Sequence, residues 1–305
     1  MSLTEKPLDH AERMARALLS LEGLSVGDGF GERFFAARSL VAESVEARQA
    51  PAPPWPYTDD TEMALALVQV LDEHGRVAQD RLAQLFAKRF RDNPYRGYGG
   101  GAIEILERIH LGMDWRPVSS QVFNGTGSKG NGAAMRVAPL GAYFAEDLGR
   151  AAEEARLSAE VTHFHPEGQA GAMAVAVAAA WASGARGPAR ELFDVVLEYT
   201  PAGATRRGLE RARAWPLDTS PTAAAKELGS GSRVLSEDTV PYVVWCAARH
   251  LNHFEDALWA TVSGRGDMDT TCAMVGGIVV MATGQGAIPA PWRTAREPLR
   301  LRAGR

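Results

Sequence analysis

Apolar residues recur at helical spacing along most of this chain. From 61 to 74 they fall largely on one helix face, at positions 63, 65, 67, 68, 70 and 71. The same reasoning predicts helices at 8–21, 77–90, 102–110, 151–162, 168–183, 191–199, 205–214, 240–250, 254–262 and 270–283. No segment shows the sustained alternation of branched residues that predicts a strand. We therefore predict an all-α fold.

Glycine and proline interrupt this pattern. Four glycines between positions 23 and 31 follow the first predicted helix, and we expect them to break it. The proline-rich segment 50–56 is expected to be a stiff loop that delivers the chain to Thr58, because proline fixes φ and restricts its predecessor. Gly276 and Gly277 lie inside the last predicted helix, where glycine costs about 1 kcal/mol. We expect this pair to permit close packing.

Composition narrows the class of protein. The chain has 305 residues, of which 46% are hydrophobic, so a large core is expected. Length alone allows about two domains of ~150 residues each. The formal net charge of -4 shows no basic excess of the kind that marks a nucleic-acid or membrane surface. Cys246 and Cys272 are too few for a disulfide framework and lack zinc-site spacing, so we expect buried small side chains.

The first ten residues and the longest apolar run suggest no membrane association. The first ten residues are polar, unlike a signal peptide, and the longest apolar run, 170–182, is shorter than the ~20 residues that a bilayer requires. We therefore expect a soluble, cytoplasmic protein. The basic C-terminal tail, 291–305, is expected to be a frayed, solvated end rather than a binding patch.

Two short acidic clusters stand out. Thr58-Asp59-Asp60-Thr61 and Asp267-Met268-Asp269-Thr270 each place two carboxylates and hydroxyl groups directly before an apolar helical stretch. Each cluster alone is explained by helix capping, in which side-chain oxygens accept hydrogen bonds from free backbone N–H groups. A cap needs only one oxygen, however. Four carboxylates brought together would form the all-oxygen site that a hard divalent cation prefers.

Two further motifs admit more than one interpretation. The glycine-rich segment 124–132, which continues to Arg136, is either an ordinary turn or a loop whose N–H groups approach phosphate, with charge from Lys129 and Arg136. It is not a Walker loop. His163 and His165, followed by Glu167, lack the spacing of a helical zinc site. Orientation of a substrate or a loop is the favoured role for these histidines.

Taken in order, these motifs resemble the ADP-ribosylglycohydrolases, including the dinitrogenase-reductase-activating glycohydrolases. The resemblance runs from Gly23 to about Gly286. It rests on Gly27-Asp28-Gly29-Phe30-Gly31, Thr58-Asp59-Asp60-Thr61, Gly130-Asn131-Gly132-Ala133-Ala134-Met135-Arg136, Thr162-His163 with His165-Pro166-Glu167-Gly168, and Gly266-Asp267-Met268-Asp269-Thr270. It implies one compact orthogonal helical bundle spanning 1–305, with a core at about 11–288, rather than two domains.

The resemblance also implies a site. Two Mg²⁺ ions, or Mn²⁺, would be bound by Thr58, Asp59, Asp60, Asp267, Asp269 and Thr270. The substrate would contact Gly100, Ser128, Gly130, Asn131, Gly132, Met135, Arg136, His163 and His165. One position departs from the family pattern, because Phe35 occupies the place of a glutamate that can act at the metal site. Glu32 lies one helical turn earlier, and we hypothesise that it supplies the missing carboxylate.

The function implied is a Mg²⁺-dependent hydrolase. It would cleave the glycosidic bond at C1″ of ADP-ribose attached to a protein side chain or a nucleic-acid base, with Asp60 or Glu32 accepting the proton of water. Two alternatives stay open: a two-metal hydrolase of free ADP-ribose conjugates such as esters, and a non-catalytic ADP-ribose-binding protein. The partner is accordingly an ADP-ribosylated macromolecule or a small molecule that contains ADP-ribose.

Overall fold

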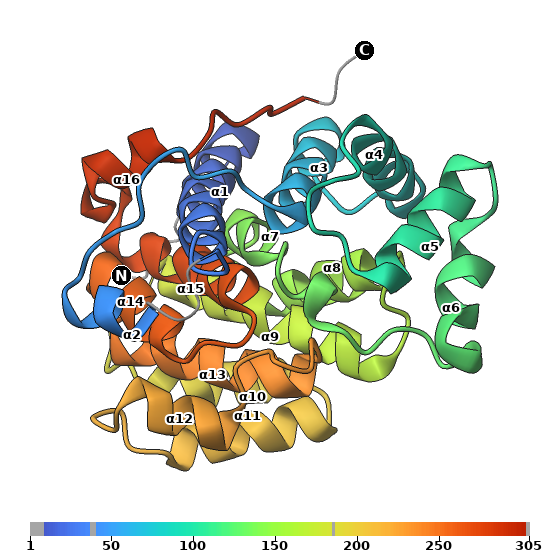
Figure 1. The fold of residues 1–305 in the computed structure, drawn as a ribbon. Coiled ribbons are helices and arrows are strands. Elements are labelled where there is room, and N and C mark those ends of the chain that lie inside the picture. The colour runs from blue at the N-terminus through green and yellow to red at the C-terminus, as the bar shows by residue number, and fades with distance from the viewer. Residues whose placement is uncertain (1–8, 37–40, 185–186, 303–305) are drawn as a thin grey trace.

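A computed structural model describes residues 9–36, 41–184 and 187–302. Within these ranges the chain forms helices and no strand, which confirms the predicted all-α class (Figure 1). The elements in order are α1 (His10–Glu32), α2 (Val41–Glu46), α3 (Asp59–His74), α4 (Gln79–Asp92), α5 (Gly100–His110), α6 (Trp115–Gly125), η2 (Asn131–Ala133), α7 (Ala138–Tyr143), α8 (Leu148–Glu160), α9 (Pro166–Ala182), α10 (Glu191–Tyr199), α11 (Ala204–Ala214), α12 (Pro221–Leu228), α13 (Ser236–Arg249), α14 (Phe254–Ser263), α15 (Met268–Thr283), η3 (Gln285–Ala287) and α16 (Ala290–Ala295).

The first and last long helices, α1 and α15, pack against each other at the centre of the fold. The expectation that the early glycines break the first helix was wrong, because α1 continues through them to Glu32. A Cβ added at Gly27 would lie 2.1 Å from the carbonyl oxygen of Cys272, so no larger residue fits there. The expectation for Gly276 is confirmed, since a Cβ there would lie 2.3 Å from the Gly23 carbonyl oxygen.

Small residues also build the interior around α9. This helix carries alanine, glycine and valine on nearly all sides, and most of it is buried. A helix that is apolar all round belongs inside a core, where small side chains let several neighbours approach closely. Helices α7, α8, α10, α13 and α15 pack against it. In the described part of the chain, no helix is both long and apolar enough to cross a membrane.

The described part of the C-terminal tail, 291–302, does not fray as expected, and residues 303–305 lie outside the described residues. The chain forms α16, whose Trp292 stacks on Phe30 of α1 with ring centroids 4.6 Å apart. The following residues pair with the loop before α3: the Trp55 amide donates to the Ala295 carbonyl at 2.7 Å. An aromatic cluster and backbone hydrogen bonds therefore fix a segment whose arginine content suggested a solvated end. Figure 1 shows this red segment leaving α16 and passing α1 towards α3.

Candidate active site

The two acidic clusters begin two helices that meet on the same side of α1. The proline-rich loop ends at Thr58, whose Oγ1 accepts a hydrogen bond from the Asp60 amide at 3.3 Å and so caps α3. Asp267 occupies the position before α15. The hydroxyl of Thr270 lies 3.4 Å from Oδ2 of Asp60, which joins clusters 210 residues apart. Capping therefore explains the role of the Thr58 hydroxyl, but it does not account for the carboxylates of the two clusters.

Asp28 is a third component of the site; it belongs to the motif Gly27–Gly31, but no role was predicted for it. It lies on α1 and is fully buried. Its carboxylate accepts hydrogen bonds from the backbone amides of Thr58, at 3.0 Å, and Thr61, at 3.1 Å, and contacts both threonine hydroxyls. Asp28 therefore ties α1 to the first turn of α3. The two glycines that flank Asp28 were the sequence feature that could have indicated its role, because they allow helices to pack close to this carboxylate.

Burial and mutual repulsion disfavour ionisation of these carboxylates. Desolvation, followed by the charge of Asp28, raises the pKa of Asp59 to about 8. Desolvation, followed by the charges of neighbouring carboxylates, raises the pKa of Asp60 and of Asp269 well above the ordinary value. One Oδ1 atom of each of these last two residues is buried without a hydrogen-bond partner. Orphaned carboxylate oxygens beside like charges are what a bound cation would satisfy.

The donor set fits a hard divalent cation, since it consists of carboxylate and hydroxyl oxygens. Within the described ranges, no group of three or more acidic, histidine or cysteine side chains is already arranged to hold an ion. Cation binding would therefore require the side chains to turn towards a common centre.

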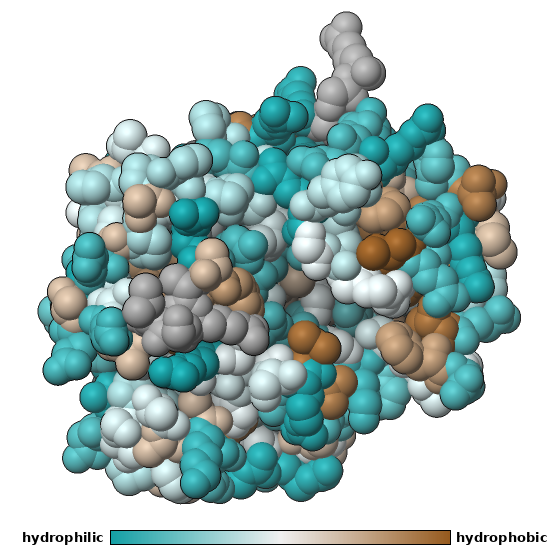
Figure 2. Space-filling model, in the orientation of Figure 1, coloured by the Kyte–Doolittle hydropathy of each residue, from teal (hydrophilic) through white to brown (hydrophobic). Residues whose placement is uncertain are grey.

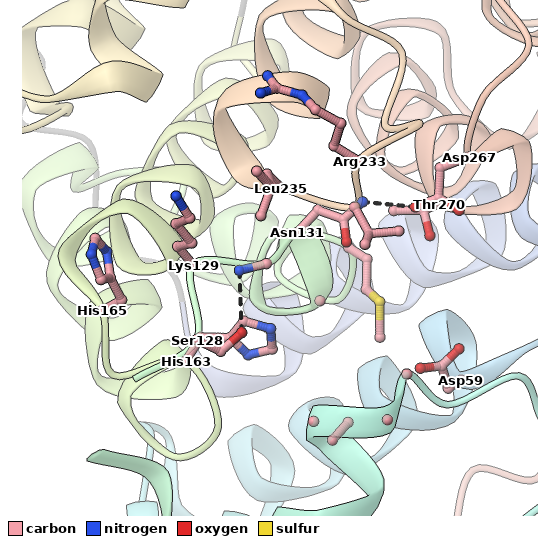
Figure 3. Close-up of a pocket in the computed structure, with 18 of the residues that line it drawn as sticks. Asp59, Ser128, Lys129, Asn131, His163, His165, Arg233, Leu235, Asp267 and Thr270 are labelled. Carbon is pink, nitrogen blue, oxygen red and sulfur yellow. Dashed lines mark hydrogen bonds between the residues drawn. The ribbon is translucent and has the colours of Figure 1, made fainter. Parts of the chain in front are cut away.

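A cleft of about 760 Å³ opens beside the acidic residues. Figure 2 shows the surface hollowed near the middle of this face, and Figure 3 shows several of the lining side chains. Most of the predicted site residues line it: Asp59, Asp267, Asp269, Thr270, Gly100, Ser128, Gly130, Asn131, Gly132, Met135, His163 and His165. Thr58 and Asp60 are buried beside these residues rather than in the lining. These lining residues come from five separate segments of the sequence, which the fold brings together.

The glycine-rich loop forms another wall of the cleft and is tied to the acidic residues. The Asn131 side chain donates to Oδ2 of Asp267 at 2.7 Å, a contact drawn in Figure 3, and to the Thr239 hydroxyl at 3.1 Å. The Ser128 hydroxyl accepts from the Gly130 amide at 3.2 Å. Asn131 therefore orients a carboxylate as well as lining the cleft.

His163 packs beneath this loop. Its Nδ1 lies 2.8 Å from the Thr162 hydroxyl. A Cβ on Gly132 would lie 3.1 Å from its Nε2. Burial, followed by the charge of Arg136, lowers the pKa of His163 to about 3, so the imidazole is neutral near pH 7. It can offer an uncharged ring nitrogen but not a cation to the cleft.

Arg136 requires a correction, because it is fully buried and lies outside the cleft lining. Its guanidinium donates to the Ser158 carbonyl at 2.8 Å, to the Thr162 hydroxyl at 3.0 Å and to the Gly132 carbonyl at 3.3 Å. It therefore fixes the loop from below and does not reach a substrate. Spacing alone could not distinguish these roles.

Glu32 and Phe35 lie at and just beyond the end of α1. Glu32 is half-buried; desolvation raises its pKa, and the nearby Asp267 charge adds to the shift. It stands outside the cleft lining, on the acidic side of the site. Phe35 lines a separate cavity of about 470 Å³ that also borders Asp267. The structure thus leaves Glu32 near the carboxylates while Phe35 faces away from the main cleft.

Sequence reasoning missed several residues of the cleft. Phe123 is 57% exposed and, like Asn124, has a left-handed backbone, with φ of 53° and 60°. Non-glycine residues in this region are strained and cluster at functional sites. Met63, Arg233 and Leu235 also line the cleft. The Asn124-Gly125 pair indicated a turn, but nothing in the sequence indicated which side chain the turn would present.

Comparisons with known proteins show which proteins this chain resembles. The chain is 29% identical over 272 residues to the ADP-ribosylhydrolase ARH3 of Bos taurus, covering 79% of this chain and 74% of the relative. It is 24% identical to the ADP-ribosylarginine hydrolase Tri1 of Serratia proteamaculans, covering 93% and 76%.

A solved "ADP-ribosylglycohydrolase-related protein complex" has the same fold, with a TM-score of 0.67, 23% identity and coverage of 94% of both chains. A family model described as ADP-ribosylglycohydrolase matches residues 9–303. The chain belongs to the ADP-ribosylglycohydrolase family.

Proposed function

We propose that this protein is a divalent-cation-dependent hydrolase that cleaves the bond between C1″ of ADP-ribose and a protein side chain or nucleic-acid base. The observation that carries the proposal is the convergence of carboxylates from α1, α3 and the start of α15 beside one cleft. Family membership supports the substrate class. The like charges, the orphaned oxygens and the all-oxygen donor set support cation binding.

The proposed ligands are Thr58, Asp59, Asp60, Asp267, Asp269 and Thr270. Two Mg²⁺ ions, with Mn²⁺ as a substitute, would supply Lewis acidity towards ribose hydroxyls and water when bound. The chain itself orients and encloses the substrate. Gly130 and Gly132 of the loop line the cleft, where glycine lets phosphate or ribose oxygens approach the backbone closely.

Cleavage develops positive charge on the ribose, which nearby carboxylates stabilise. Water forms a bond to C1″ as the bond from C1″ to the side chain or base breaks. The proton of the attacking water passes to a carboxylate, either Asp60 or Glu32, and the leaving group takes up a proton. The two residues differ in access, because Asp60 is 1% exposed and Glu32 is half-buried.

The test is a release assay on ADP-ribosylated arginine, serine and DNA, with a free ADP-ribose ester as a fourth substrate. We expect Mg²⁺-dependent turnover of at least one substrate, loss with EDTA, and at least a ~100-fold loss in Asp269→Ala, the size typical of a lost charge-stabilising group. Asp60→Asn and Glu32→Ala identify the proton acceptor: wild-type turnover in Glu32→Ala excludes Glu32.

The same panel separates the alternatives. Turnover of the ester alone indicates a hydrolase of free conjugates. Binding of ADP-ribose without turnover in Mg²⁺ indicates a non-catalytic binding protein. Full activity in thoroughly chelated enzyme contradicts the cation-dependent mechanism.

A further inference from the structure

The C-terminal segment makes specific contacts beside the acidic cluster. We name residues 296–301 the C-terminal strap. The Glu297 amide donates to the Trp55 carbonyl at 3.0 Å, so the strap runs along the loop that delivers the chain to Thr58 and Asp59. In the described residues the strap contributes nothing to the cleft lining. Its contacts with the site are therefore indirect.

The Glu297 carboxylate is the centre of these contacts. Its Oε1 accepts a hydrogen bond from the Tyr57 amide at 3.1 Å and forms an ion pair with Arg96. The same guanidinium donates to the Tyr57 carbonyl at 2.7 Å and lies over the Tyr57 ring, 4.2 Å from its centroid. One carboxylate and one guanidinium thus hold both backbone polar groups of Tyr57.

Arg96 transmits this restraint to the carboxylate cluster. Its backbone carbonyl accepts the hydrogen bond of the Asp59 amide at 2.7 Å. Gly97, the next residue, lines the cleft with a φ of 89°, and a Cβ there would lie 3.7 Å from Oδ1 of Asp59. The position of Arg96 therefore sets both the start of α3 and the adjacent wall of the cleft.

A second set of contacts links the strap to α3. Arg89 is 4% exposed and donates to the carbonyls of Arg300, at 3.0 Å, and Leu301, at 3.2 Å. It also pairs with Glu62, in the first turn of α3, at 2.9 Å. Both sets of contacts thus end at the first turn of α3, which carries Asp59 and Asp60. A buried, charge-assisted network of this kind fixes geometry more firmly than a surface ion pair.

We propose that Glu297, acting through Arg96, is a positioning residue that holds Asp59 in place for cation binding. The proposal rests on the cation-dependent function proposed above. Glu297 touches no cleft atom, so its effect passes through the Arg96 carbonyl and the Tyr57 backbone. Partners of metal ligands typically change cation affinity by 10–100-fold when removed.

The experiment compares Glu297→Ala, Glu297→Gln and a control in the same C-terminal segment. Arg293→Ala is the control, because Arg293 pairs with Glu22 of α1 at 2.8 Å and, among the described residues, forms no hydrogen bond or ion pair with Tyr57, Asp59 or Arg96. Mg²⁺ affinity is measured by titration calorimetry on the full chain. Hydrogen exchange of the Tyr57 and Asp59 amides is measured without metal.

We expect Glu297→Ala to weaken Mg²⁺ binding by ~10-fold or more and to accelerate exchange at Tyr57 and Asp59. Glu297→Gln keeps an acceptor for the Tyr57 amide but loses the ion pair, so it should fall between Glu297→Ala and wild type. Arg293→Ala should leave both readouts within about twofold of wild type, well below that 10–100-fold range. Wild-type affinity and exchange in Glu297→Ala, even with a lower melting temperature, would overturn the proposal and show a merely structural role.

Failure of the underlying function looks different. A wild-type protein that binds no Mg²⁺ or Mn²⁺ refutes the cation-dependent function and, with it, the positioning role. A wild-type protein that binds Mg²⁺, with unchanged affinity in Glu297→Ala, refutes only the positioning role.

Discussion

Asp59 illustrates how one residue gains chemistry from its surroundings. Its side chain is 9% exposed and faces several like charges. Asp9 and Asp114, which cap α1 and α6, are exposed to solvent. The same residue type at the start of a helix is thus a cap in one place and a component of a buried, charged site in another. Burial beside other carboxylates makes the difference.

This environment predicts a pH dependence for the metal-free protein. The pKa of Asp59 rises from 3.8 to about 8 on folding, so between these values the folded state holds more protons than the unfolded state. Stability must then fall as pH rises through this window. Asp59→Asn, which stays neutral, should escape the loss and become more stable than wild type by on the order of a few kcal/mol near pH 8.

Thermal unfolding in EDTA at pH 5, 6, 7 and 8 checks this. The difference in melting temperature between Asp59→Asn and wild type should grow with pH. A difference that is constant across the series would show that Asp59 ionises freely in the folded protein.

At the scale of elements, the length and packing of each helix determined whether it could be predicted from the sequence. The apolar spacing located most long helices, because α3, α4, α10, α11, α13 and α14 each bury a recognisable face. The short helices α2, α7, α12 and α16, of six to eight residues, were not predicted, since so few turns carry little periodicity. Helix α6 was not predicted either, and its backbone leaves the helical conformation at 122–124. The extent of α1 was wrong for another reason. Its glycines look like helix breakers until α15 is placed against them.

The residues of the site likewise divide into those that the sequence identified and those that it could not identify. Residues that carry a distinctive motif, such as Asp267 and Asn131, were identified from sequence and do line the cleft. Arg136 belongs to a motif but faces the interior, and sequence gives no direction for a side chain outside a regular element. The strap around Glu297 carries no motif, so only the folded structure relates it to Asp59.

The contact between α1 and α15 yields a direct test at this scale. Gly27→Ala would place a Cβ 2.1 Å from the Cys272 carbonyl oxygen, so the helices must separate. We expect a loss of about 3 kcal/mol in the free energy of unfolding, despite the better helix propensity of alanine. Urea denaturation measures the change.

Gly286→Ala is the matched control, because a Cβ there meets open space. It should change the stability by no more than about 0.5 kcal/mol. Equal effects of the two substitutions would contradict the close packing of these helices.

At the scale of the whole molecule, the site joins the two ends of the chain. Asp28, Asp59 and Asp60 come from the N-terminal part, while Asp267 and Asp269 come from the start of α15, near the C-terminus. The strap then returns to α3 through Glu297. A cation bound between α3 and α15 would therefore bridge segments that separate on unfolding, and the folded state alone would bind it.

Mg²⁺ should accordingly stabilise the entire fold. At a concentration 100 times the dissociation constant, a ligand that binds only the folded state adds about 2.7 kcal/mol per site. For a chain of 305 residues this corresponds to a rise in melting temperature of roughly 4 °C per site. Scanning calorimetry with and without Mg²⁺ measures the rise, and Asp269→Ala, which lacks a ligand from α15, should lose most of it. An unchanged melting temperature in saturating Mg²⁺ would mean that these carboxylates do not bridge the two ends of the chain.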